Sequence, residues 1–134
     1  MAKIQLRNEI LFRAPTHVGL LAEVTERLNA KGVNVLGLRA YEEEDIGVFL
    51  VYADNSRLAA EALDSLPDGR TNTAAVISAE VPNEPGHLAR IARVLAEADI
   101  SVLEVHVTST DAPTAEVVIN TDDNIRAMDA LEKL

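Results

Sequence analysis

The chain has 134 residues, enough for one ordinary domain or two small ones, and its 48% hydrophobic and 25% charged residues are typical of a globular protein. Its formal net charge of −10 disfavours binding to nucleic-acid phosphates and anionic membranes, and the absence of cysteine excludes disulfides, thiolate metal sites and cysteine nucleophiles. No apolar run reaches the ~20 residues of a membrane-spanning helix, and the first residues lack a signal peptide's apolar stretch, so a cytoplasmic protein is expected.

The first half of the chain predicts a strand, a helix, two strands and a second helix. In chain order these cover residues 4–13, 20–31, 33–41 and 48–52, followed by a helix that begins at Asp54, Asn55 or Ser56. The first helix follows from the amphipathic spacing of Leu21, Val24 and Leu28, and Gly32 predicts its end. Residues 67–69, Pro-Asp-Gly, predict a turn, because proline presets φ and glycine accepts a left-handed backbone.

The second half repeats this order. It has strands at 71–81, 100–108 and 116–119, a loop at 82–86, a helix around Leu88, Ile91 and Leu95, a turn at Asp111, Ala112 and Pro113, and a last helix near Asp122. At a spacing of 67 residues the halves share seven identities between positions 15 and 41, where chance gives roughly two or three. At a spacing of 68 the identities resume, from Asp54 with Asp122 to Leu66 with Leu134. We interpret the chain as a duplication with repeats 1–69 and 70–134.

The order of elements predicts an α+β fold of two ferredoxin-like βαββα(β) repeats that pair side by side, with antiparallel sheets and helices on one face. Such a unit normally closes with a fourth strand, but each repeat shows three clear strands. The first strands, 3–13 and 71–81, are long enough to serve two roles each, so a shared and a missing closing strand both stay open. Residues 48–52 are apolar on both faces, which fits either a covering second subunit or ordinary β-propensity.

The helix that opens each repeat follows a loop that ends in glycine, with leucine two positions later. Residues 81–91, VPNEPGHLARI, show this pattern closely, and residues 14–24, APTHVGLLAEV, show a looser version of it. Nearly the whole chain therefore resembles the ACT domain family. That resemblance implies a regulatory, allosteric module of amino-acid metabolism, of the kind that binds a free amino acid. It also implies a tandem protein without an enzyme domain of its own.

The resemblance also implies where a ligand binds. In the family, an amino acid lies between two paired domains, at the glycine loop of one and the start of the second strand of the other. Here the better-matched site comprises Asn83, Glu84, Pro85, Gly86, His87, Leu88 and Asn34, and the weaker second site comprises Thr16, His17, Val18, Gly19, Leu20 and Ser101. Independently of the family, a tight strand-to-helix turn leaves the first helical N–H groups unpaired, which suits a carboxylate.

Plainer interpretations of the same residues stay open. Gly19 and Gly86 are expected in any tight turn, Asn34 can be an ordinary polar residue at a strand start, and Asn83 can cap the helix that follows it. The three histidines lack metal-ligand spacing, and the chain lacks the nucleophile-elbow and phosphate-binding motifs. We therefore expect no metal, no cofactor and no enzyme activity.

The expected function is that of a regulatory protein that holds an amino acid or a related metabolite between its two repeats. The alternative is an interaction subunit of a biosynthetic enzyme, without ligand binding of its own. The expected protein partners are a second copy of the chain, forming a homodimer, and a metabolic enzyme. Neither nucleic acid nor membrane is an expected partner, because the net charge is negative.

Overall fold

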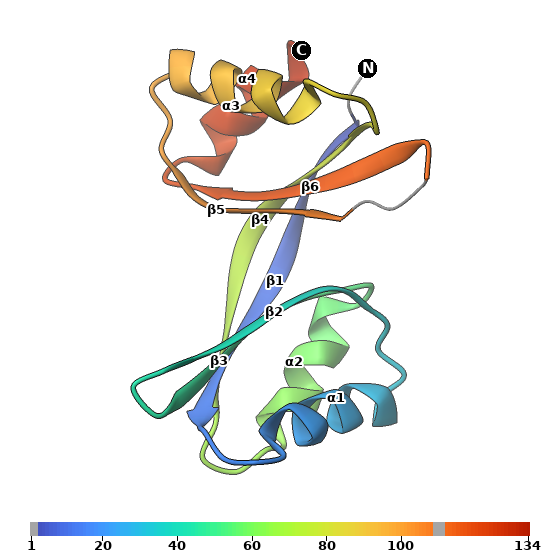
Figure 1. Ribbon diagram of the computed structural model, residues 1–134, viewed down its shortest axis with the longest axis vertical. Helices are drawn as coiled ribbons and strands as arrows, with labels where there is room; N and C mark the ends of the chain where they lie inside the picture. Colours follow the sequence, from blue (N-terminus) through green and yellow to red (C-terminus); the bar gives the residue numbers. More distant parts are fainter. Residues whose placement is uncertain (1–2, 109–111) are drawn as a thin grey trace. The chain divides into compact units, whose positions relative to one another are not determined.

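The structure is a computed structural model that describes residues 3–108 and 112–134 (Figure 1). In chain order its elements are β1 (Lys3–Pro15), α1 (Leu20–Ala30), β2 (Val35–Glu43), β3 (Ile46–Ala53), α2 (Ser56–Asp64), β4 (Arg70–Pro82), α3 (His87–Glu97), β5 (Val102–Thr108), β6 (Thr114–Thr121) and α4 (Asn124–Glu132). The strands follow the order β2-β3-β1-β4-β6-β5 in one sheet. The predicted order of strands and helices is confirmed in both halves. Of the predicted turn at 111–113, Asp111 lies outside the described residues.

The chain forms two compact units whose bounds differ from the repeats 1–69 and 70–134. The first unit contains residues 8–74, and the second contains residues 75–134 together with the start of β1, up to Arg7. The difference arises because β1 and β4, each 13 residues long, contribute residues to both units. The boundary between the sequence repeats therefore falls between α2 and β4. The boundaries between the compact units instead fall within β1 and β4.

The first unit has its strands in the order β2-β3-β1-β4, with α1 and α2 on one face (Figure 1). Phe12 of β1 and Phe49 of β3 are register partners, with ring centroids 6.0 Å apart. Val24 and Leu28 of α1 and Leu63 of α2 are buried in the same cluster. The period of two along the strands and of 3.6 along the helices brings both apolar sets into one layer between helices and sheet.

The second unit has the matching order, β5-β6-β4-β1, and residues 3–7 of β1 supply its fourth strand. Ile4 in this segment packs against a core that contains Ile77, Ile119 and Leu131, all almost fully buried. The first unit likewise takes its fourth strand from residues 70–74 of β4. The closing strands are therefore shared, since each unit borrows the end of the other repeat's long first strand.

Local backbone groups set the ends of the helices. Gly32 follows α1 in the left-handed region at φ 69°, and Asp99 takes the same place after α3 at φ 57°. Asn55 caps α2 and Asp123 caps α4, each with a side-chain oxygen that accepts a backbone N–H of the first turn. Each cap satisfies an N–H group that the helix itself leaves without an acceptor, which typically stabilises a protein by about 1 kcal/mol.

The turn between α2 and β4 differs from its prediction. The left-handed residue is Asp68, at φ 65°, and not Gly69. Gly69 is required for space instead, because a Cβ placed there would lie 2.4 Å from Cε1 and Cζ of Phe12. Aspartate tolerates the left-handed region better than most residues do. The turn therefore forms with the side chain of Asp68 exposed at the surface.

Candidate functional site

Two short loops lead from a long strand into a helix, one before α1 and one before α3. Each loop ends in a left-handed glycine at the N-cap, with φ 95° at Gly19 and 97° at Gly86, and neither helix has a side-chain cap. The first helical bonds run from Glu23 N to Gly19 O and from Arg90 N to Gly86 O, both at 3.0 Å. The N–H groups that precede them lie outside the helical ladder, an arrangement that suits a carboxylate.

Asn83 anchors the loop before α3. Its Nδ2 donates to Ala112 O at 2.9 Å, and its backbone N donates to Pro113 O at 2.9 Å, both in the connection between β5 and β6. In the first unit, Thr16 N donates to Asp45 O at 2.9 Å, in the connection between β2 and β3. The interpretation of Asn83 as a helix cap is wrong, because the N-cap is the loop glycine. A ligand contact by Asn83 stays a prediction.

Asn34 and Ser101 occupy matched positions immediately before β2 and β5. The backbone N of Asn34 donates to Asp54 Oδ1 at 3.0 Å, and that of Ser101 donates to Asp122 Oδ1 at 3.1 Å. Both side chains are exposed, and within residues 3–108 and 112–134 neither makes a hydrogen bond. Asn34 belongs to the first unit and the loop of Gly86 to the second. That the two share a ligand stays a prediction.

The remaining residues of the two predicted sites differ in exposure. Exposed residues are Val18, Glu84, Pro85 and Leu88. Leu20 is a core residue, with 6% of its surface exposed. His17 Nε2 lies 3.1 Å from Glu23 Oε2, and His87 Nε2 lies 3.6 Å from Glu84 Oε2. A histidine–carboxylate pair therefore lies at the start of each of these helices, although the paired residues come from different positions of the repeat.

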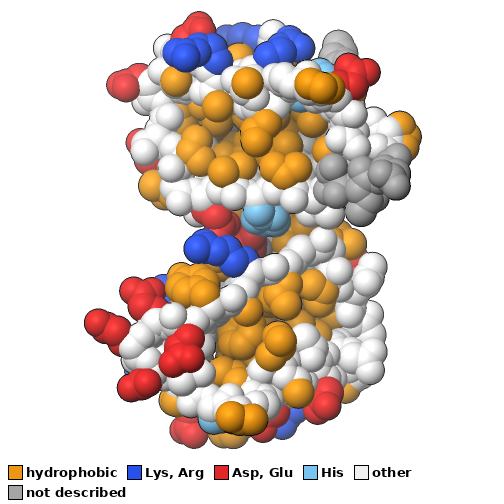
Figure 2. Space-filling view, in the orientation of Figure 1, with side chains coloured by type: hydrophobic (Ala, Val, Ile, Leu, Met, Phe, Trp, Pro, Cys, Tyr) orange, Lys and Arg blue, Asp and Glu red, His pale blue; other side chains and the backbone are white. Residues whose placement is uncertain are grey.

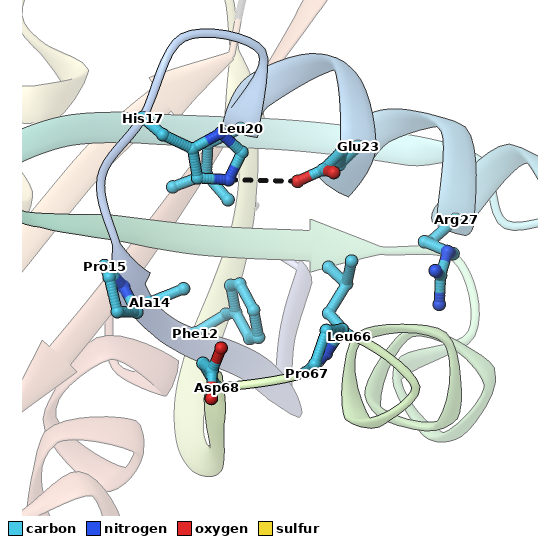
Figure 3. A pocket seen from close by; sticks show the side chains of 10 residues that line it. All are labelled: Phe12, Ala14, Pro15, His17, Leu20, Glu23, Arg27, Leu66, Pro67 and Asp68. Carbon is cyan, nitrogen blue, oxygen red and sulfur yellow. Dashed lines mark ion pairs between the residues drawn. The ribbon is translucent and has the colours of Figure 1, made fainter.

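A pocket of about 230 Å³ lies beside α1 in the first unit (Figure 3), and we call it the α1 pocket. It is lined by Phe12, Ala14, Pro15, His17, Leu20, Glu23, Arg27, Leu66, Pro67 and Asp68. Figure 3 shows His17 and Glu23 on one side and Asp68 on the opposite side, with Phe12 near Asp68. The buried members of the lining are Phe12, Ala14, Leu20 and Leu66. The pocket therefore has an apolar floor and a charged rim.

Sequence reasoning finds only one wall of the α1 pocket. His17 and Leu20 belong to the weaker predicted site. In the opposite wall, Pro67 and Asp68 were predicted only as part of the turn at 67–69, and Leu66 was assigned no role in a site. The two walls are more than 40 residues apart in the chain, and no local pattern connects them. The only available signal is an aspartate in a Pro-Asp-Gly turn, which is a common turn sequence whatever the function.

A shallower hollow of about 270 Å³ lies between the same loop and β2. It is lined by Thr16, His17, Gly19, Leu20, Leu21, Ala40, Tyr41, Glu42, Gly47 and Phe49. The structure thus brings together four of the six residues of the weaker predicted site, namely Thr16, His17, Gly19 and Leu20. Val18 is not part of this lining, and Ser101 belongs to the second unit.

The described lining of the α1 pocket combines buried apolar side chains with a few charged ones. It contains a histidine paired with a carboxylate, but no hydroxyl or thiol that could act as a nucleophile. Nη1 of Arg27 is occupied by Ser65, whose O and Oγ accept hydrogen bonds at 3.0 and 2.6 Å. An apolar floor with a few charged groups around it is the usual composition of a small-molecule site.

Comparison with known proteins gives one family match and several similar structures. Residues 75–134 match the ACT domain family, while no curated protein matches the sequence. Protein BT0572 from Bacteroides thetaiotaomicron has a similar structure, with a TM-score of 0.87 and 22% identity over 97% of this chain and 89% of that one. The ligand-free regulatory subunit of aspartate kinase from Thermus thermophilus has a TM-score of 0.67 and 16% identity, over 98% and 95% of the two chains. Aspartate kinase from Clostridium acetobutylicum has a TM-score of 0.55 and 14% identity, over 96% of this chain and 33% of that one.

These likenesses extend over both units, because each solved structure covers at least 96% of this chain. At such identities they show a common fold. In the part of the chain that the structure describes, no helix is long and apolar enough to cross a membrane. Residues 75–134 therefore belong to the ACT domain family, and a unit with the same order of strands and helices precedes them.

Proposed function

We propose that this chain is a cytoplasmic regulatory protein of amino-acid metabolism that has no catalytic activity and senses a free amino acid or a related metabolite. The observation that carries the proposal is the ACT domain match over residues 75–134, which contains the loop of Gly86. The structural likeness to a regulatory subunit of aspartate kinase supports the same role. Binding would act by shifting the conformation or assembly of the chain or of a partner enzyme.

We further propose that the ligand lies between the repeats, at the loop of Gly86 and at Asn34. The N–H groups at the start of α3 precede the first helical bond and suit the carboxylate of an amino acid. The exposed amide of Asn34, which makes no hydrogen bond within residues 3–108 and 112–134, can both donate and accept. Asn83 would contribute by fixing the shape of the loop through Ala112.

Thermal unfolding in the presence of single amino acids tests this proposal. An amino acid that binds the folded chain should raise the free energy of unfolding by about 1.4 kcal/mol at ten times its dissociation constant, and should shift the unfolding temperature accordingly. Isothermal titration calorimetry then gives the affinity. If no amino acid or related metabolite shifts the unfolding temperature at millimolar concentration, the sensing proposal is wrong.

The duplication supplies a matched control for the site. The double variant Asn83→Ala/Asn34→Ala should abolish binding, whereas Thr16→Ala/Ser101→Ala, at the equivalent positions of the other predicted site, should retain it. Circular dichroism of the unliganded variants shows whether each is folded, which matters because Asn83 also anchors its loop. Equal affinity in the two double variants would contradict the assignment to the Gly86 loop.

The alternative function is that of an interaction subunit of a biosynthetic enzyme that binds no ligand itself. It is favoured by the likeness to aspartate kinase from Clostridium acetobutylicum, of which this chain matches one third. In that case an affinity-tagged chain should co-purify with one metabolic enzyme from its own cells, and amino acids should leave the unfolding temperature of the isolated chain unchanged. Ligand-dependent stabilisation of the isolated chain would exclude this alternative.

We also propose that the chain forms a homodimer. In the sheet order, β2 and β5 each have a single neighbouring strand within the described residues, so each has an open edge. Hydrophobic side chains lie exposed on these strands, among them Leu38 at 41%, Val105 at 47% and Val107 at 46%. Figure 2 shows hydrophobic side chains gathered on the visible face of each half. Open strand edges with apolar side chains are prone to pair with another chain, and a second copy is the simplest partner.

Replacing Val105 with lysine should weaken the dimer at least tenfold, because a charged side chain at an apolar contact must lose its hydration. Sedimentation equilibrium should give twice the chain mass of 14.5 kDa for the unchanged protein and a shift towards the monomer for Val105→Lys. The matched control is Ile125→Lys, at a 71% exposed position on α4, which should leave the dimer intact. A monomeric unchanged protein would exclude the dimer.

A further inference from the structure

We propose that the α1 pocket binds a small aliphatic ammonium ion, the chemistry shared by free amino acids and their decarboxylated amines. The proposal does not depend on the ligand site at the Gly86 loop. It concerns the first unit alone, and of the residues assigned to the predicted sites it uses only His17 and Leu20. Three features of the pocket carry the proposal: its floor, its unbalanced charge and its difference from the second repeat.

The floor of the pocket matches a short aliphatic chain. Phe12, Ala14, Leu20 and Leu66 are at most 7% exposed, and they present carbon atoms to the cavity. The volume of about 230 Å³ corresponds to the liquid volume of about eight water molecules, at ~30 Å³ each. An alkyl group of four or five carbons fits within this space. Its transfer from water onto this floor is favourable.

The rim of the pocket has an uncommitted negative charge. His17 Nε2 lies 3.1 Å from Glu23 Oε2, and Nη1 of Arg27 donates to the backbone and hydroxyl oxygens of Ser65. Asp68 makes no hydrogen bond or ion pair within residues 3–108 and 112–134. Figure 3 shows the carboxylate of Asp68 across the pocket from Glu23. An ammonium group has three donors and one positive charge, so it complements this carboxylate and those lone pairs of Glu23 that His17 leaves open.

The second repeat shows that the fold does not require these charges. At the spacing of 67 residues, Glu23 corresponds to Arg90 and Arg27 corresponds to Val94, although both helices bury the same apolar face. His17 corresponds to Glu84 in the same way. Since α3 packs onto its sheet with other residues at these positions, the shared fold does not require the His17–Glu23 pair, whereas Arg27 also connects α1 to Ser65. Side chains that a fold does not need are candidates for function.

Asp68 can be tested without disturbing the turn. Its φ of 65° lies in the left-handed region, which asparagine tolerates at least as well as aspartate. The variant Asp68→Asn therefore removes the charge and keeps the backbone. Asp45 provides the matched control, because it has φ 66° in the β2–β3 turn and does not line the pocket. The variant Asp45→Asn makes the same chemical change in the same backbone conformation.

In the experiment, the full chain is titrated separately with 3-methylbutylamine, leucine and 3-methylbutanoate. NMR and calorimetry monitor the binding of each compound. The ammonium compound should bind and shift the signals of residues around Phe12 and Leu66, whereas the carboxylate without an amine should not. Asp68→Asn should weaken binding at least tenfold, and Asp45→Asn should leave it unchanged. No binding of 3-methylbutylamine, equal binding of the carboxylate, or equal losses in the two variants would each overturn the proposal.

Leucine distinguishes the two sources of the ammonium group. If the Asp68-dependent binding of leucine is tighter than that of the amine, the natural ligand is an amino acid whose carboxylate approaches Arg27. If the amine binds more tightly, the natural ligand is a decarboxylated amine. Both results support the ammonium site. The variant Asn83→Ala/Asn34→Ala should bind 3-methylbutylamine with unchanged affinity, so a failure at the Gly86 loop is distinguishable from a failure here.

Discussion

Replacing Phe12 with alanine is expected to lower the free energy of unfolding by about 3–5 kcal/mol, the usual cost of removing a buried aromatic ring. Phe12 has no exposed surface and packs with Phe49, at 6.0 Å between ring centroids, in a chain with only two phenylalanines. The neighbouring aliphatic side chains cannot fill the space that a lost ring leaves. Urea denaturation followed by circular dichroism measures the change as a lower midpoint.

Two further variants show whether the effect arises from core packing. Phe12→Leu should cost less than Phe12→Ala, because a branched aliphatic side chain fills part of the same volume. Leu21→Ala, on the exposed side of α1 at 53% exposure, should change the free energy of unfolding by about 0.5 kcal/mol or less. A cost below about 1 kcal/mol for Phe12→Ala would show that this ring is not part of a well-packed core.

Replacing Gly69 with alanine is expected to lower the free energy of unfolding by about 1–3 kcal/mol, because it forces an extra carbon into a packed region. The new Cβ would lie 2.4 Å from two ring atoms of Phe12, far inside van der Waals contact, so the buried ring or the turn would have to shift. Gly69 does not have a left-handed backbone, so the cost comes from the collision alone. The shift in urea midpoint measures it.

The collision partner can be removed to check this explanation. In the background Phe12→Leu, the additional cost of Gly69→Ala should fall, and a double-mutant cycle gives the coupling energy. Gly47→Ala provides a comparison, since its Cβ would come nearest to the flexible end of the Leu20 side chain, at 2.7 Å, with the ring of Phe49 farther away at 3.3 Å. If Gly69→Ala costs the same with and without the ring, its effect has another origin.

Local patterns in the sequence were sufficient to predict most of the fold. The apolar spacing from Leu21 to Leu28 and the glycine at position 32 correspond to a helix that ends at Ala30, with Gly32 in the left-handed region. The repeated order of elements also led to the ferredoxin-like units. From the sequence, shared closing strands and missing closing strands were both possible. A long strand has room to pair with two neighbours, but its length does not identify those neighbours, so the sharing of β1 and β4 could not be predicted.

The candidate site was less predictable than the fold. The glycine loops were found, since a left-handed N-cap needs glycine whatever surrounds it. The anchoring of Asn83 to Ala112 and the α1 pocket were missed, because both depend on segments that are distant in the chain. The left-handed residue of the turn was assigned to Gly69 instead of Asp68, since the sequence does not show that Phe12 fills the space beside that glycine.

The sharing of strands sets an order in which the protein can fold during its synthesis on the ribosome. Residues 8–74 form a complete unit, so that unit can fold while the rest of the chain is still being made. The segment that includes Ile4 is synthesised well before the residues of the core that it joins, which come from position 75 onwards. Until those residues emerge, this segment is an unpaired strand edge that a chaperone must protect or a neighbouring nascent chain can capture.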